Sequence, residues 1–374
     1  MNTLYEQPRT LQTDSSMPLV SVIMPVYNAA ETLIQTLSSL RAQTYTHFEC
    51  ICVNDGSRDN SLEIVQDFAT RDVRFKVINQ RNLGPSAARN RGIHAATGDI
   101  VMFIDADDTY KPYTIERAVD IFVEKHPEVI TFGFDVEPNT CAPISMRELQ
   151  TPRAGEFSGY STTCIFHSNS RPFGVRVALA ASFIQRENVH FDEAVGLGED
   201  QVFFMYIYPR SQKTILIEDH LYVYTMRSSS FAHDLHKAQA HSQKIEAHML
   251  VVKSIINDWI HKPWMPRAQK ELISWILDFM LFDLVQEPPL NRSRFAAELA
   301  CLLDRIQMSA STFGFWDLHP NSNFYKSCAR VPKEYVCFHL RIWWCSMLNV
   351  AELWPVCVVC LRTYKVIALI PKRS

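Results

Sequence analysis

The chain lacks the features that would assign it at once to several large classes of protein. Its 37 lysine and arginine residues are balanced by 40 aspartate and glutamate residues, and the formal net charge of −3 supplies no bulk basic field for nucleic acid. No run approaches the roughly 18 uncharged apolar residues of a membrane-spanning helix, because the nearest one, 354–370, contains Arg362 and Lys365. Residues 1–17 are polar and have no apolar core, which argues against a signal peptide.

Cysteine spacing typical of a metal site is also missing. Cys50 and Cys52 fall inside a predicted strand, and Cys357 and Cys360 form a C-x-x-C with no second pair. We interpret the cysteines as reduced side chains that pack as small hydrophobic groups, as in a cytosolic protein. The sequence has no internal repeat and no low-complexity segment, and its 374 residues fit one large domain plus an appendage.

From Leu19 onward, strand and helix patterns alternate. Near-continuous apolar runs predict strands, and apolar residues at helical spacing between them predict helices. The expected strands are 20–26, 48–53, 75–78, 100–104 and 129–134, and the expected helices are 30–40, 62–69, 87–96 and 114–125. This alternation predicts an α/β fold with a mostly parallel sheet that is covered by helices on both faces.

The pattern changes further along the chain. Residues 139–170 are irregular and rich in proline, serine and threonine, as in a loop over a site, and regular patterns return at 175–183 and 213–224. Beyond His233 the apolar spacing is helical, at 250–260, 268–285 and 295–306. We therefore expect a flexible N-terminus over 1–18, an α/β domain over 19–232 and a helical region over 233–374.

Polar clusters follow three of the predicted strands. They are Pro25-Val26-Tyr27-Asn28, Asn54-Asp55-Gly56-Ser57 and Asp105-Ala106-Asp107-Asp108. Each could be turn chemistry, since Asn, Asp, Gly and Ser are the usual turn formers. The carboxyl ends of parallel strands meet at one rim of a sheet, where ligands bind in such folds, and three clusters there indicate a site.

The carboxylates of Asp105-Ala106-Asp107-Asp108 carry the clearest chemistry. Like charges crowded at a strand end are costly unless a cation or hydrogen-bond donors offset them. A hard divalent cation with oxygen ligands, completed by substrate phosphates, is one solution, and no cysteine or histidine cluster favours a softer metal. The alternative is a solvated turn whose aspartates cap the helix that begins at Thr114.

Five motifs occur in a fixed order: 22–28, 53–57, 82–92, 98–99 with 105–108, and 198–200. In this order and spacing the chain resembles the inverting family 2 glycosyltransferases of the GT-A fold, of the type that builds bacterial cell-surface polysaccharides. The resemblance covers about residues 19–230, and it implies that the α/β domain is the catalytic domain. The C-terminal third carries no motif of the family.

The resemblance implies that a nucleotide-sugar donor contacts a set of residues along these motifs, namely Pro25, Val26, Tyr27, Asp55, Gly84, Arg89, Asp105, Ala106, Asp107 and Arg227. Asp55 would accept a hydrogen bond from the base or the ribose, or else form a turn before the next helix. Gly84 would let the backbone approach the donor. Arg89 either contacts donor phosphate or ribose oxygens or braces the aspartates.

The family pattern also assigns the metal and the catalytic base. Asp107 would bind Mn²⁺ or Mg²⁺, which neutralises charge on the departing nucleoside diphosphate, while Asp108 would contact metal-bound water or the protein. Asp200 would be the catalytic base, and Glu199 would support it or contact the acceptor. The alternative for this pair is a preference for carboxylates at the N-terminus of a helix over 202–207.

The resemblance further implies a UDP-linked donor, a glycan or lipid-linked acceptor, and a cytoplasmic enzyme. The basic and aromatic tail around Trp343 and Trp344 suggests peripheral contact with the inner membrane, and an ordinary packed helix is the competing interpretation. A catalytically inactive nucleotide-sugar-binding module remains an alternative, although intact Asp107 and Asp200 argue against it. A sugar-nucleotide pyrophosphorylase would need a glycine-rich loop at 26–31, which this chain lacks.

Overall fold

The computed structural model describes residues 17–138, 144–171, 175–226 and 238–311. The chain divides into two compact units, 1–233 and 234–374. Several predicted features lie outside the described residues: Arg227, the Trp343-Trp344 tail, and the Cys357 and Cys360 pair.

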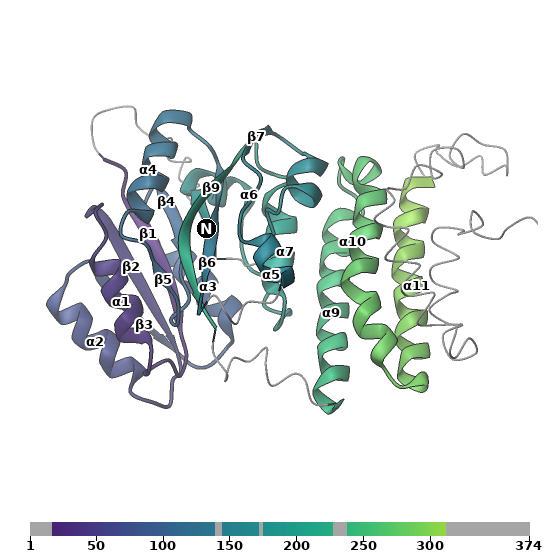
Figure 1. The fold of residues 1–374 in the computed structure, drawn as a ribbon, viewed down its shortest axis with the longest axis horizontal. Coiled ribbons are helices and arrows are strands. Elements are labelled where there is room, and N and C mark those ends of the chain that lie inside the picture. Colours follow the sequence, from purple (N-terminus) through teal and green to yellow (C-terminus); the bar gives the residue numbers. More distant parts are fainter. Residues whose placement is uncertain (1–16, 139–143, 172–174, 227–237, 312–374) are drawn as a thin grey trace, which may run out of the picture. The chain divides into compact units, whose positions relative to one another are not determined.

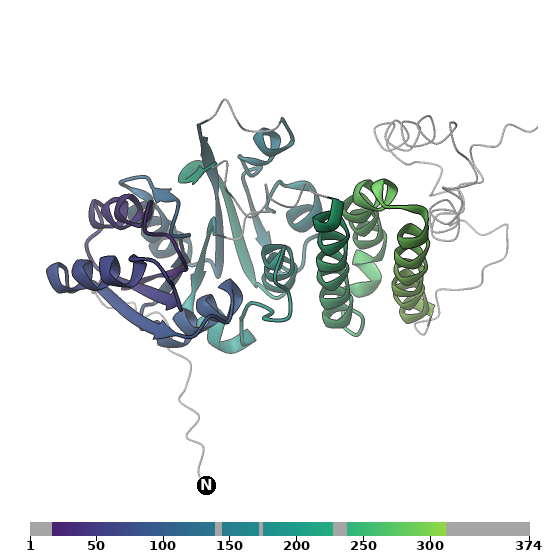
Figure 2. The same cartoon turned by 90° about the horizontal axis from the view of Figure 1, so that it is seen from below.

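The N-terminal unit is built on one nine-stranded sheet with the order β3-β2-β1-β4-β8-β6-β9-β5, in which β7 pairs with β9 (Figure 1). Its first half is parallel and consists of β1 (Val20–Val26), β2 (Phe48–Asp55), β3 (Phe75–Gln80) and β4 (Ile100–Phe103). Helices lie on both faces of the sheet (Figure 2). They are α1 (Leu33–Arg41), α2 (Ser61–Arg71), α3 (Pro85–Ala95) and α4 (Thr114–Lys125). The predicted α/β fold class is confirmed.

The other half of the sheet mixes strand directions, and there the prediction of a mostly parallel sheet does not hold. It contains β5 (Thr109–Tyr110), β6 (Val129–Glu137), β7 (Gly155–Ser158), β8 (Val177–Ala180) and β9 (Lys213–Thr225). β8 runs antiparallel to both β4 and β6, whereas β6 and β9 are parallel. The apolar pattern of a buried strand does not encode the direction of its neighbour, which explains the difference.

The predicted irregular segment 139–170 is only partly irregular. It includes α5 (Ile144–Leu149), β7 and a π-helical turn (Thr163–His167). The predicted element at 175–183 is a junction, since β8 ends at Ala180 and α6 (Ala181–Glu187) follows directly. Short elements of this kind carry too few residues for a clear periodicity.

The parallel strands position the rim that carries the polar clusters. β1 pairs Val26 with Asn54 of β2 and Ile23 with Phe103 of β4, and the three strands therefore end at one edge of the sheet. The packing of α3 on this sheet depends on Gly92, because a Cβ there would lie 2.3 Å from a side-chain carbon of Ile23. Loss of that close approach would push α3 away from β1.

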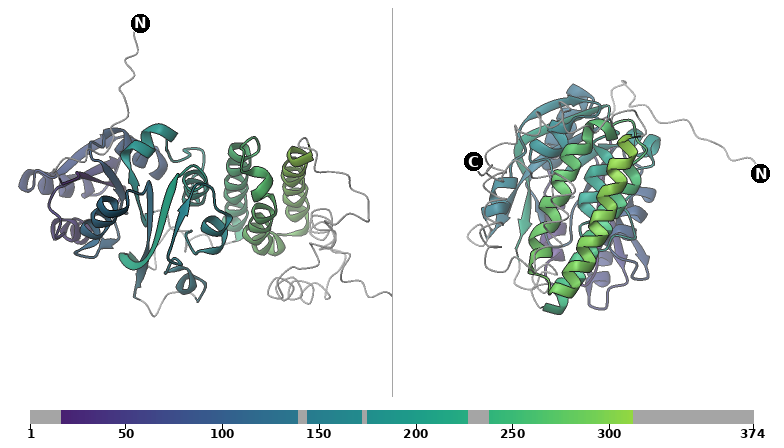
Figure 3. Two further views of the ribbon diagram at one scale, coloured as in Figure 1. Left: turned by 90° about the horizontal axis from the view of Figure 1, so that it is seen from above. Right: turned by 90° about the vertical axis from the view of Figure 1, so that its right-hand side faces the viewer.

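The C-terminal unit has three long helices, α9 (Ala238–Trp259), α10 (Met265–Gln286) and α11 (Pro289–Ser311), which lie side by side (Figure 3). They confirm the helical spacing predicted at 250–260, 268–285 and 295–306. Asp283 is buried among them, with its carboxylate oxygens 3.0 Å from Lys244 Nζ and 3.2 Å from His248 Nδ1. Among the described residues, no helix is long and apolar enough to cross a membrane.

Candidate functional site

The turn after β4, residues 105–108, makes hydrogen bonds to the start of α1 through Ala106 and to β9 through Asp108. The carbonyl oxygen of Ala106 accepts hydrogen bonds from Thr32 Oγ1 at 3.1 Å and Thr36 Oγ1 at 3.0 Å. Both threonines lie at the start of the α1 region, and Thr36 is buried. These hydrogen bonds fix the position of the turn that carries Asp105 and Asp107 relative to α1.

Asp108 is the most buried of the three carboxylates, with 1% of its surface exposed. Its oxygens accept hydrogen bonds from the Tyr222 phenol at 2.5 Å and from the Thr225 amide at 2.7 Å. Burial raises the pKa of Asp108 well above its ordinary value, and the negative charges of Asp107 and Asp105 raise it further. Of the two roles that the sequence left open for Asp108, the structure shows a contact with the protein.

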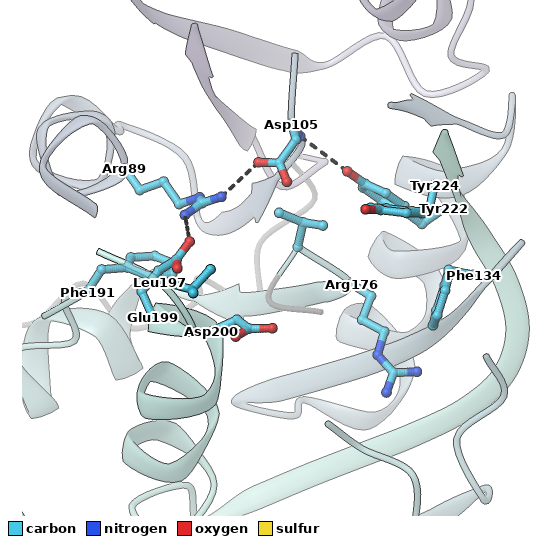
Figure 4. A pocket seen from close by; sticks show the side chains of 12 residues that line it. Arg89, Asp105, Phe134, Arg176, Phe191, Leu197, Glu199, Asp200, Tyr222 and Tyr224 are labelled. Carbon is cyan, nitrogen blue, oxygen red and sulfur yellow. Dashed lines mark hydrogen bonds and ion pairs between the residues drawn. The ribbon is translucent and has the colours of Figure 1, made fainter. Parts of the chain in front are cut away.

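Arg89 joins the turn after β4 to the acidic pair at α7 (Glu199–Ile207). Its Nη2 lies 2.8 Å from an oxygen of Asp105, and its Nη1 lies 2.9 Å from an oxygen of Glu199 (Figure 4). Arg89 is buried, and its guanidinium carbon lies 5.2 Å from the centre of the Phe191 ring. Burial alone would lower the pKa of Arg89, but Asp105 and Glu199 outweigh burial and raise it.

The acidic pair opens α7 because of its local sequence. Gly198 occupies the N-cap with a φ of +80°, a conformation that favours glycine, and Glu199 and Asp200 fill the first helical turn. Asp200 Oδ1 accepts a hydrogen bond from the Gln201 amide at 2.7 Å. Carboxylates in this position interact favourably with the positive end of the helix dipole.

Aromatic packing fixes α7 against the end of β4. Phe203 stacks on Phe191 with a centroid distance of 4.0 Å, and both rings meet Phe103 of β4 edge to face. All three side chains are buried. Such aromatic contacts add to the burial energy of the rings, and they hold the acidic pair close to the turn after β4.

These groups line a cavity of about 270 Å³ (Figure 4). Arg89, Phe191 and the acidic pair lie on one side of the cavity, and the other side carries Tyr222, Tyr224, Phe134 and Arg176. The lining comprises Arg89, Asp105, Phe134, Val175, Arg176, Phe191, Leu197, Gly198, Glu199, Asp200, Tyr222 and Tyr224. The structure thus brings Arg89, Asp105 and both predicted catalytic carboxylates into one cavity.

The other predicted donor residues that the structure describes lie on the same rim but not in the lining of this cavity. Asp55 is buried, and its carboxylate accepts hydrogen bonds at 2.8 Å from the amides of Leu83 and Gly84 and from Gln80 Nε2. Asp55 therefore shapes the loop before α3, where Gly84 has a φ of +92°. Tyr27 follows β1 and is 45% exposed.

Pro25 and Val26 form the end of β1, with Val26 fully buried. Asp107 and Ala106 belong to the turn after β4, outside the lining of the cavity. These predicted donor residues lie at or just after the carboxyl ends of parallel strands, the edge at which ligands bind in such sheets.

The carboxylates of this rim fit a divalent cation that is bound by one carboxylate and by the phosphates of a substrate. Among the described residues, no group of three or more histidine, cysteine, aspartate or glutamate side chains could hold a metal ion. Asp105 is committed to Arg89, and Asp108 to Tyr222 and Thr225. Mg²⁺ and related ions are often held by one or two carboxylates together with substrate phosphates, and Asp107 with a diphosphate matches that kind of site.

Tyr222 and Arg176 are among the cavity residues that sequence reasoning did not assign to the site. Tyr222 is an inward residue of β9 that accepts a hydrogen bond from the Asp105 amide at 3.2 Å, and only the strand pairing reveals it. Arg176 is fully buried and donates to the carbonyls of Leu149 at 3.1 Å and Asn169 at 2.5 Å. Burial lowers the pKa of Arg176 to about 10. An arginine directly before a buried apolar strand was the available signal.

Comparison with known proteins finds a family match within the N-terminal unit. Residues 21–175 match the model described as Glycosyl transferase family 2. The uncharacterized glycosyltransferase EpsJ of Bacillus subtilis (strain 168) is 30% identical over 220 residues, which are 57% of this chain and 63% of EpsJ. Glycosyltransferase GlyG of Streptococcus pneumoniae serotype 4 is 29% identical over 230 residues, which are 57% of this chain and 72% of GlyG. The chain thus spans less than two thirds of EpsJ.

Two solved structures share the fold. Staphylococcus aureus TarS 1–349 in complex with UDP-GlcNAc has a TM-score of 0.51 at 19% identity, covering 79% of this chain and 91% of that chain. The mannosyltransferase PcManGT from Pyrobaculum calidifontis, in complex with GDP-Man and Mn²⁺, has a TM-score of 0.50 at 19% identity and covers 82% of this chain and 89% of that chain. At these identities the likeness shows the fold.

The sheet, its rim of carboxylates and the shared fold define an α/β domain of the GT-A type. Residues 21–175 are a glycosyltransferase family 2 domain, as their motifs indicated.

Proposed function

We propose that the chain is an inverting glycosyltransferase that transfers a sugar from a UDP-linked donor to a glycan or lipid-linked acceptor in polysaccharide biosynthesis. One observation carries the proposal: Asp105 of the turn after β4 and the Glu199-Asp200 pair line the same cavity. A donor motif and a candidate base in one cavity are the two groups that such a transfer requires.

On the donor side, the rim of the parallel sheet supplies the nucleotide contacts. Tyr27, which is 45% exposed, offers an aromatic surface at the end of β1, with the partly buried Pro25 beside it, and the fully buried Val26 fixes this end of the strand. Asp55 acts on the base or ribose through the loop at Gly84 that it holds. The structure of TarS with UDP-GlcNAc, which shares this fold, supports the choice of a UDP-linked donor.

The divalent cation belongs to the donor complex. Asp107 would hold Mn²⁺ or Mg²⁺ together with the diphosphate oxygens, and the ion supplies neutralisation of the charge that develops on the leaving diphosphate. The structure of PcManGT with GDP-Man and Mn²⁺ supports this assignment.

Transfer proceeds by one displacement. The acceptor hydroxyl oxygen attacks the anomeric carbon on the face opposite the diphosphate, a new C–O bond forms, and the bond to the phosphate oxygen breaks with its electron pair on the diphosphate. The hydroxyl proton passes to the carboxylate of Asp200 and later to solvent. Attack from the opposite face inverts the anomeric centre.

We place the reaction in the cytoplasm, with peripheral contact at the inner membrane through the tail around Trp343 and Trp344. The apolar and basic composition of that segment, and the need of a lipid-linked acceptor to remain at a membrane, support this location.

The test is a transfer assay with the purified full chain, Mn²⁺, a panel of UDP and GDP sugars, and glycan or lipid-linked acceptors. The proposal predicts acceptor-dependent release of a nucleoside diphosphate and a product of inverted anomeric configuration. Binding of a nucleotide sugar without turnover with any acceptor of the panel would favour the inactive binding module instead. A product of retained configuration would contradict the single displacement.

A further inference from the structure

Arg89 connects two parts of the site that are remote in the sequence. Its bond to Asp105 spans 16 residues, and its bond to Glu199 spans 110 residues. Asp105 lies two positions before Asp107, and Glu199 directly precedes Asp200. A single side chain therefore fixes the turn of the proposed metal ligand relative to the turn of the proposed base.

The charges around Arg89 argue against a role in binding the diphosphate. One guanidinium is surrounded by two carboxylates, each within 2.9 Å, which leaves the cluster with a net negative charge. Arg89 has 8% of its side chain exposed, and such an arginine offers no excess positive charge to a phosphate. Each of its two Nη atoms already donates a charge-assisted hydrogen bond to one of these carboxylates.

The orientation of Arg89 is determined by those two carboxylates. Its Nε is buried and has no hydrogen-bond partner among the residues that the structure describes. A buried donor without a partner is unfavourable. The ion pairs with Asp105 and Glu199 offset this unfavourable term in the observed rotamer of Arg89. Contact with the face of Phe191, itself stacked on Phe203 of α7, holds the guanidinium in this pose.

We propose that Arg89 is a positioning residue that sets the distance between the donor turn and the Asp200 base, and that it does not bind the diphosphate of the donor. The inference rests on the proposed function, since it concerns the geometry of that transfer. Arg89 acts through Glu199, whose carboxylate is the link to the first turn of α7. The acceptor oxygen must meet the anomeric carbon in line with the leaving group, and a displacement of about 1 Å can cost about 100-fold in rate.

The experiment measures kcat and the Kd of UDP separately in two Arg89 variants. Arg89→Lys keeps the charge but cannot reach both carboxylates with a planar fork, and Arg89→Met removes the charge. In both variants we expect kcat to fall, by about 10-fold and about 100-fold respectively, with the Kd of UDP in the presence of Mn²⁺ unchanged within about twofold. A merely structural role would not produce a loss confined to kcat.

The matched control is Arg91→Met, two positions along α3, where the side chain is exposed. We expect Arg91→Met to leave both kcat and UDP binding at the wild-type level. A weaker Kd for UDP in Arg89→Lys, or an unchanged kcat in both Arg89 variants, overturns the proposal. If the wild-type chain neither binds UDP or GDP nor transfers any sugar of the panel, the proposed function fails, and this outcome is distinct from a failure of the positioning role.

Arg89→Met leaves two carboxylates without their cation, and this variant could fail to fold for that reason. A second variant, at Glu199, tests the proposal in that case. Glu199→Gln breaks the same link from the other end and removes a charge. It should reproduce the loss of kcat with unchanged UDP binding, and the double variant Arg89→Lys/Glu199→Gln should lose no more than the worse single variant. Fully additive losses in the double variant would show that Arg89 does not act through Glu199.

Discussion

The phenol of Tyr222 donates a 2.5 Å hydrogen bond to Asp108, and the same oxygen accepts a hydrogen bond from the Asp105 amide. Tyr222 belongs to β9, more than a hundred residues away from the turn that it contacts. One buried hydroxyl therefore ties the end of β4 to the far half of the sheet and holds the Asp105–Asp108 turn in place.

Tyr222→Phe tests this tie. The change leaves the shape of the ring but removes one of the two donors that satisfy the buried Asp108, and we expect the free energy of unfolding to fall by about 1–3 kcal/mol. Urea unfolding of the full chain measures the effect. Tyr113→Phe is the control, because Tyr113 is 46% exposed, and it should change stability by less than about 0.5 kcal/mol. Equal stability of the two variants would contradict the role of Tyr222.

The lowered pKa of Glu49 makes the stability of the N-terminal unit depend on pH. Burial by itself would raise the pKa of Glu49, but hydrogen bonds from Lys76, Ser21 and Thr97 outweigh it and lower the pKa below 4.5. A carboxylate whose pKa is lower in the folded state stabilises the fold above its unfolded pKa, and this contribution disappears as pH falls through the folded pKa.

We therefore expect Glu49→Gln to destabilise the chain at pH 7 and to have a smaller effect at about pH 4. Unfolding in urea at the two pH values gives the comparison, with Glu63→Gln as the control because Glu63 is exposed in the first turn of α2. A loss for Glu49→Gln that grows as the pH falls has the wrong sign and would sink the assignment.

Asp107→Ala tests the proposed metal ligand. A ligand that binds only the folded chain raises its stability by mass action, by about 2.7 kcal/mol at a concentration of 100 times the Kd. In the wild-type chain, UDP with Mn²⁺ should raise the melting temperature more than UDP alone, and Asp107→Ala should abolish this difference. Asp120→Ala, at an exposed position of α4, should preserve it. A metal-dependent shift that survives in Asp107→Ala would exclude Asp107 as the ligand.

Asp283→Asn addresses the helical unit. Asp283 is buried, accepts a 3.0 Å hydrogen bond from Lys244 and lies 3.2 Å from His248, and loss of its charge leaves the Lys244 ammonium on α9 without its carboxylate. We expect a loss of about 2 kcal/mol in unfolding experiments. Glu246→Gln removes an exposed ion pair with Arg294 and should cost less than about 1 kcal/mol. A larger loss in Glu246→Gln than in Asp283→Asn would be the opposite of this expectation.

Much of the parallel half of the sheet follows from the sequence, because its strands and helices have clear and different periods. The expected strand 20–26 and helix 114–125 coincide with β1 and α4. The ends of these strands placed three polar clusters on one rim, and the register of β1 with β2 and β4 confirms that rim.

The interactions that complete the site could not be read in the same way. The bond of Arg89 to Glu199 and that of Tyr222 to Asp108 both join residues more than 100 positions apart. The local sequence shows that Arg89 and Glu199 can ionise, but it does not show which charge each will meet. Strand direction beyond β4 was hidden for the same reason, since it depends on which strands become neighbours.

The most direct test of the account is a calorimetric titration of UDP with and without Mn²⁺ into the wild-type chain and into Asp200→Asn, followed by the transfer assay on both. The account predicts that Mn²⁺ strengthens UDP binding in both proteins, and that Asp200→Asn binds UDP like the wild type but transfers no sugar. Loss of UDP binding in Asp200→Asn, or transfer at the wild-type rate without this carboxylate, would contradict the assignment of Asp200 as the base.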